Sequence, residues 1–70
     1  MAEERVRKLR TVREQRNLSL RELAEELKVH YSLISYWERG LKTPRAGNKI
    51  KLSKALGKPA DELLEYIDED

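Results

Sequence analysis

The sequence predicts an all-α fold, a compact bundle of about five short helices. Apolar residues recur at spacings of three and four, and no segment shows the alternation typical of a strand. Leu is the commonest apolar residue, which favours helix. Seventy residues allow one small domain, 1–70, and without cysteine it must fold by packing alone.

The first helix is expected from Glu3 to Arg16, before an interruption at Asn17. Its apolar positions are three apart, and Lys and Arg occupy most of the remaining surface. This pattern predicts a cationic helix with a thin apolar stripe. The stripe consists of Val6, Leu9 and Val12.

Two further helices are expected to be joined by a turn of three or four residues. Ser19 and Glu22 have the spacing of a capping box, which begins a helix of about two turns. After the turn, a second apolar stripe ends at Gly40, a residue suited to a left-handed helix stop. The stripe consists of Leu33, Ile34 and Trp37.

A fourth helix is expected over roughly Arg45 to Leu56, with Ile50 among its apolar positions. Ala46 and Gly47 make a weak start, so its first half is expected to be irregular. Pro59 can occupy the first turn of a fifth helix that continues through Ile67.

The charges are segregated along the chain. Residues 1–60 hold all 15 Lys and Arg with seven acids, and residues 61–70 hold six acids and no base. A basic body favours a polyanion as partner, although a solvated, highly charged surface explains the charge equally well. No apolar run approaches the roughly 18 residues of a membrane span, and we expect a cytoplasmic protein with no membrane contact.

A helix, a tight turn and a second helix lie between Ser19 and Arg39. In DNA-binding proteins the second helix of such a unit enters the major groove. The segments 18–24 (LSxxELA) and 34–40 (ISxWERG) closely resemble the Cro/cI-type, or XRE-type, helix-turn-helix family of phage and bacterial transcription regulators. The resemblance runs from about Val6 to Leu64 and implies a lambda-repressor-like domain. The helix-turn-helix occupies about 19–39, and an acidic C-terminal helix or tail occupies 60–70.

The resemblance implies that the third helix reads DNA bases. Ile34 and Trp37 face inward, and the helical spacing of 32, 35 and 36 places those positions on a different face. Hydroxyls can bond to base edges or phosphates, and tyrosine rings can contact a thymine methyl; alternatively, the tyrosines are half-buried surface rings. The base-reading candidates are Tyr31, Ser32, Ser35 and Tyr36.

Phosphate contacts are expected from the rim of this face. A helix N-terminus presents free amide N–H groups, so the beginning of the second helix suits a phosphate. For each basic residue the alternative is simple solvation. The candidates are Ser19, Arg21, Arg39, Lys42, Thr43 and Arg45.

We interpret Arg13 and Glu38 as a structural ion pair between the first and third helices. Three positions depart from the family pattern. Leu20 replaces a frequent Gln, and Lys49 replaces a core Leu. Lys28 replaces the turn Gly, which requires either a strained left-handed residue or another turn geometry.

We therefore expect a sequence-specific regulator, a repressor, that binds double-stranded DNA as a homodimer on a two-fold symmetric operator. The alternative is an antitoxin or other protein-interaction module whose partner binds the acidic C-terminal helix. The candidate dimer contacts are Leu41, Leu63, Leu64, Tyr66 and Ile67. With no Cys, one His and no Gly-rich phosphate loop, we expect neither catalysis, nor a metal site, nor a cofactor.

Overall fold

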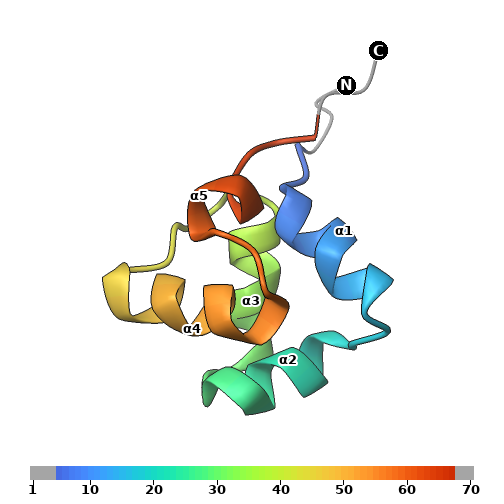
Figure 1. Cartoon of the computed structure of the whole chain (residues 1–70), viewed down its shortest axis with the longest axis vertical. Helices are drawn as coiled ribbons and strands as arrows, with labels where there is room; N and C mark the ends of the chain where they lie inside the picture. Colours follow the sequence, from blue (N-terminus) through green and yellow to red (C-terminus); the bar gives the residue numbers. More distant parts are fainter. Residues whose placement is uncertain (1–4, 68–70) are drawn as a thin grey trace.

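The structure is a computed structural model that describes residues 5–67. This part of the chain contains five helices and no strand, which confirms the predicted all-α fold (Figure 1). The helices are α1 (Lys8–Gln15), α2 (Leu20–Leu27), α3 (Tyr31–Glu38), α4 (Ala46–Leu56) and α5 (Ala60–Leu63).

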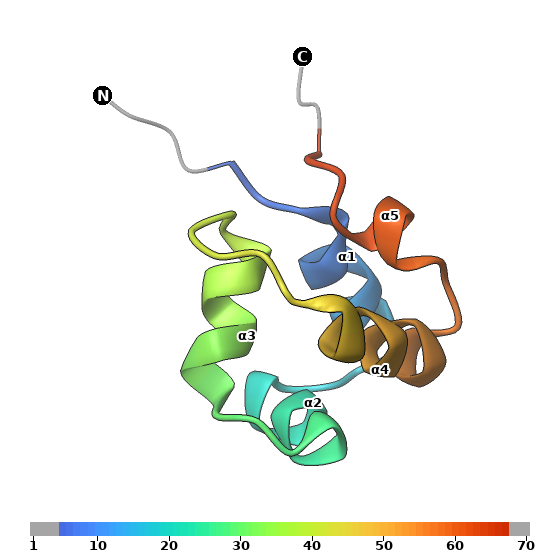
Figure 2. The ribbon, with the colours of Figure 1, turned by 90° about the vertical axis from the view of Figure 1, so that its left-hand side faces the viewer.

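The helices close around one aliphatic core with a single tryptophan. Helix α3 packs against α1 and α2, α4 packs against α2 and α5, and α5 returns to α1 (Figures 1 and 2). Each helix contributes the side chains of one stripe, as expected for short amphipathic helices. The buried apolar residues are Leu9, Val12, Leu23, Ala24, Leu27, Ile34, Trp37, Leu52, Leu56 and Leu63.

Helix α1 is shorter than predicted. It begins at Lys8, and Glu3, where we expected it to begin, lies outside the described residues. The Val6 carbonyl accepts a hydrogen bond from the Ile67 N–H at 2.8 Å, and the Lys8 N–H donates to the Glu65 carbonyl at 2.8 Å. Because these backbone groups pair with residues 65 and 67, residues 5–7 are not helical, and Arg7 is extended.

The prediction that the last helix continues through Ile67 is wrong. Helix α5 ends at Leu63, and the chain after it runs beside the segment that leads into α1 (Figures 1 and 2). Tyr66 forms an isolated antiparallel bridge with Arg7 there. Pairing with the N-terminal segment thus replaces helical pairing over residues 64–67. Within the described residues, the expected acidic C-terminal helix is a single turn, and residues 68–70 lie outside them.

Helix α4 is continuous from Ala46, so the prediction of an irregular first half is also wrong. Its cap residue is Arg45, and Gly47 faces open space, where a missing side chain costs no packing. Ile50 does not join the core; 58% of its surface is exposed. Within residues 5–67, no helix is long and apolar enough to cross a membrane.

Candidate nucleic-acid interface

Local contacts fix both the beginning of α2 and the turn that joins α2 to α3. The predicted capping box begins α2: Ser19 Oγ accepts from the Glu22 N–H at 3.0 Å, and Glu22 Oε1 accepts from the Ser19 N–H at 2.8 Å. Helix α2 ends at Lys28 in the left-handed conformation, with φ 59°. His30 Nδ1 then accepts from the Ser32 N–H at 3.1 Å and so caps α3.

This capping limits the predicted phosphate site at Ser19. The Ser19 N–H is already bonded to Glu22, whose carboxylate also places a negative charge at the positive end of the α2 dipole. The Glu22 N–H is also taken, by Ser19 Oγ, so the donors of that helix end left for an anion are the N–H groups of Leu20 and Arg21. The Ser19 hydroxyl accepts one bond and can still donate its proton.

Helix α3 separates an inner apolar side from an outer polar side. Ile34 and Trp37 are buried, whereas Tyr31 is exposed and Tyr36 is half-buried. Ser32 and Ser35 are also half-buried on the outer side. The four predicted base-reading residues are therefore all accessible from outside.

Cationic side chains flank both tyrosines of α3. The Arg21 guanidinium lies 4.9 Å from the Tyr31 ring centroid, and the His30 ring stacks on Tyr31 at 4.5 Å. Arg39 and Lys42 lie 5.5 and 5.6 Å from the Tyr36 ring centroid. The aromatic face of α3 is thus bordered by positive charge at both of its ends, as expected at a surface that meets phosphates on either side of a groove.

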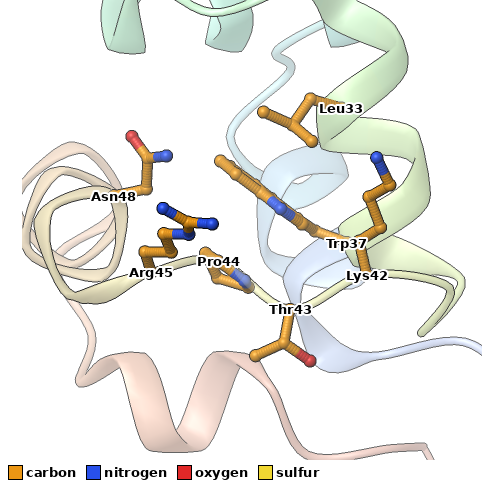
Figure 3. Close-up of a pocket in the computed structure, with 7 residues that line it drawn as sticks. All are labelled: Leu33, Trp37, Lys42, Thr43, Pro44, Arg45 and Asn48. Atoms are coloured by element: carbon orange, nitrogen blue, oxygen red, sulfur yellow. The ribbon is translucent and has the colours of Figure 1, made fainter.

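A cleft of about 380 Å³ opens between α3 and the beginning of α4. Figure 3 shows Arg45 and Asn48 on one side of this cleft and Trp37 on the other. The first turn of α4 has no acidic residue and no side-chain cap, so its N–H groups and its dipole favour an anion. The residues that line the cleft are Leu33, Trp37, Lys42, Thr43, Pro44, Arg45 and Asn48.

Sequence reasoning missed two residues of this region. Asn48 was not singled out, although a polar residue in the first turn of a helix beside basic residues is a readable signal. Arg7 was counted with the exposed cations of the first helix, yet it is buried and donates to the loop after α3. No local pattern marks Arg7, because its partners are remote in sequence.

Arg13 and Glu38 lie together in the interior. Arg13 Nε donates to Glu38 Oε2 at 2.5 Å and Arg13 Nη2 to Glu38 Oε1 at 3.4 Å. Arg13 Nη1 also donates to the Leu18 carbonyl at 2.6 Å, and Glu38 is 4% exposed. This two-point contact fixes α1 to the end of α3 and to the entry of α2.

The candidate dimer contacts differ in how much of each is exposed. Leu63 is completely buried, so it cannot meet a second copy of a folded chain, and that prediction is wrong. Leu41 is 63% exposed, whereas Leu64, Tyr66 and Ile67 are half-buried beside the N-terminal segment. The reason is the early end of α5, which directs residues 64–67 back onto the protein.

The fold and the basic, aromatic outer side of α3 define a DNA-binding helix-turn-helix protein. The sequence model described as Helix-turn-helix matches residues 9–63, most of the chain. The chain belongs to the XRE-type, or Cro/cI-type, helix-turn-helix family, which is a family of DNA-binding regulators. No curated protein matches the sequence closely enough to count as a relative.

Proposed function

We propose that this regulator is a repressor that reads a two-fold symmetric operator as a homodimer, with α3 in the major groove. The observation that carries the proposal is the outer side of α3, where Tyr31 and Tyr36 lie between Arg21 at one end and Arg39 and Lys42 at the other. Aromatic rings and hydroxyls suit base edges, and the flanking cations suit the two phosphate backbones.

The roles divide into base reading and phosphate binding. Base reading falls to Tyr31, Ser32, Ser35 and Tyr36. Phosphate binding falls to Arg39, Lys42, Thr43 and Arg45 beside the uncapped end of α4, and to Arg21 and Ser19 at the beginning of α2. We add Asn48 to the phosphate-binding residues because it lines the same cleft as Arg45.

Dimerisation supports specificity because one domain of this size makes few base contacts. Two half-sites about one helical turn apart multiply these contacts, and the operator then has two-fold symmetry. Leu41, Leu64, Tyr66 and Ile67 remain candidates for the contact. The family resemblance supports a bacterial or phage origin and a cytoplasmic location as parts of the same proposal.

The alternative role as an antitoxin or protein-interaction module rested on an acidic C-terminal helix. Within the described residues α5 is only four residues long, and the apolar residues after it are half-buried against their own domain. No observation in the structure therefore favours this alternative over DNA reading.

The test is selection of tight binders from a pool of random DNA duplexes at two salt concentrations, for the wild type and for Tyr36→Ala. We expect a palindrome for the wild type and relaxed preference at one position of each half-site for Tyr36→Ala, worth about 1–3 kcal/mol. Sequence-blind binding that Tyr36→Ala leaves unchanged would contradict base reading by α3.

Two matched cation variants separate phosphate contacts from general charge. Lys42→Ala should reduce the slope of log affinity against log salt by about 1. Lys54→Ala removes the same charge from a groove shared with Glu26 and Lys51, away from the α3 face, and should leave the slope unchanged. Equal effects of the two variants would contradict the proposed phosphate surface.

A further inference from the structure

The loop between α3 and α4, residues 41–44, is held by a side chain from the N-terminal segment. Arg7 Nη1 donates to the Trp37 carbonyl at 3.2 Å and to the Lys42 carbonyl at 3.0 Å. Arg7 Nη2 donates to Thr43 Oγ1 at 3.2 Å. One guanidinium therefore connects the last turn of α3 to the two loop residues that we assign to phosphate binding.

Arg7 is itself held in place by the C-terminal segment, residues 64–67. Tyr66 pairs with Arg7 in the antiparallel bridge, and its ring centroid lies 5.1 Å from the Arg7 guanidinium. The Arg7 N–H donates to the Glu38 carbonyl at 2.7 Å. The guanidinium thus lies near the Tyr66 ring and donates to the Trp37 and Lys42 carbonyls, a set of contacts that suits the planar fork of arginine and not lysine.

The surroundings of Arg7 differ from those of an ordinary structural ion pair. Arg7 is 8% exposed, and within residues 5–67 no carboxylate forms an ion pair with it. Its acceptors are two carbonyl oxygens and one hydroxyl. Because these acceptors are neutral and belong to α3 and to the loop, the Arg7 guanidinium acts here as a hydrogen-bond donor that ties the loop to α3.

We propose that Arg7 and Tyr66 are positioning residues for DNA binding, which fix the loop so that Lys42 and Thr43 meet the phosphate backbone. The inference rests on the proposed function and extends it to residues that do not touch DNA. The C-terminal segment then sets DNA affinity from outside the interface, because displacement of the Tyr66 ring frees Arg7 and with it the loop.

The test compares Arg7→Lys with the wild type in DNA affinity at several salt concentrations, on the selected operator. Lysine keeps the charge but cannot reproduce the planar fork that spans the three acceptors. We expect affinity to fall by about tenfold, the value of one charge-assisted hydrogen bond. We expect the slope of log affinity against log salt to become shallower by about 1–2, because each lost phosphate contact removes roughly 0.9 from its magnitude.

Tyr66 gives a second pair of variants. Tyr66→Ala removes the ring beside Arg7 and should reproduce the Arg7→Lys effect on the salt slope. Tyr66→Phe keeps the ring and should bind as the wild type does. If Tyr66→Phe loses as much DNA affinity as Tyr66→Ala does, this would contradict positioning through the ring.

Two controls separate positioning from loss of stability and from loss of charge. Val12→Ala weakens the core without touching the loop, so its salt slope should stay at the wild-type value even where its melting temperature falls. Arg10→Ala removes a neighbouring exposed cation, whose Nε donates to Glu14 Oε2 at 3.3 Å within α1, and should also leave the slope unchanged. A slope for Arg7→Lys equal to that of Val12→Ala overturns the proposal.

Backbone amide exchange of Leu41 and Lys42, whose N–H groups both donate to the Tyr36 carbonyl, gives an independent measurement without DNA. We expect faster exchange at these two residues in Arg7→Lys and Tyr66→Ala, and unchanged exchange in Val12→Ala. If the wild type binds DNA and the Arg7→Lys protein matches it, the positioning inference alone fails. If the wild type binds no DNA, the proposed function fails and the inference fails with it.

Discussion

The turn between α2 and α3 and the loop between α3 and α4 are both short connections beside the same helix, but they are held in different ways. In the turn, the Lys28 N–H bonds to the Glu25 carbonyl and the Val29 N–H to the Ala24 carbonyl. The loop also has local bonds, from the Leu41 and Lys42 N–H groups to the Tyr36 carbonyl, but its Lys42 carbonyl and Thr43 hydroxyl are held by Arg7, 35 residues before Lys42 in sequence. The turn therefore folds with its own helices, whereas the loop is completed only when the two ends of the chain meet.

The largest expected effect comes from Glu38, whose carboxylate ties the end of α3, where the loop begins, to Arg13 of α1. Glu38→Ala leaves the buried Arg13 without its carboxylate and should lower the free energy of unfolding by about 3–5 kcal/mol. Urea unfolding measures the loss. The selected DNA sequence should stay the same under conditions where the variant remains folded; similar stability with lost binding would contradict a structural role.

The next effect tests how closely the chain ends pack on the end of α3. Gly40 has φ +76°, and a Cβ at this position would overlap the Tyr66 hydroxyl. Gly40→Ala should lower the free energy of unfolding by about 2 kcal/mol, because left-handed strain and displacement of Tyr66 add together.

A double-mutant cycle with Tyr66→Ala separates these two causes. In that background the overlap is gone, so Gly40→Ala should cost only the backbone strain, about 1 kcal/mol. Equal losses in both backgrounds would mean that Tyr66 does not pack on Gly40.

The smallest expected effect concerns the turn between α2 and α3, the connection that is held by local hydrogen bonds. Lys28 adopts φ 59° and ψ 45°, so Lys28→Gly should relieve strain and raise the free energy of unfolding by about 0.5 kcal/mol. Lys28→Ala removes the same charge but keeps the Cβ, and should give no increase. A destabilised Lys28→Gly protein would show that the left-handed residue carries little strain.

Local signals explain what could be predicted of the fold. The apolar spacing, the Ser19–Glu22 box and the glycine stop after α3 involve residues close in sequence, and the elements they predict are present. Apart from the first half of α4, which is regular and leaves Ile50 on the surface, the errors in element bounds fall near the two ends of the described chain. There, residues 5–7 and 64–67 give up helical hydrogen bonds for pairing with each other, and a sequence pattern does not report that competition.

The candidate site also has a part that local sequence patterns predict and a part that depends on tertiary packing. The outer positions of α3 follow from helical spacing, because Ile34 and Trp37 are strongly apolar and fix which side faces inward. The cleft with Asn48 and the buried position of Arg7 could not be predicted, because they depend on how α4 and the chain ends pack on α3.

The sequence alone determined the helical class, the helix-turn-helix unit and the basic character of its surface, since periodicity, caps and charge are local properties. Only the tertiary structure decided where the terminal helices stop, that Leu63 is core and Ile50 is surface, and that Arg7 holds the loop beside the DNA-binding face. The physical reason is that burial and long-range hydrogen bonds depend on which segments meet, and side chains distant in sequence compete for the same backbone groups.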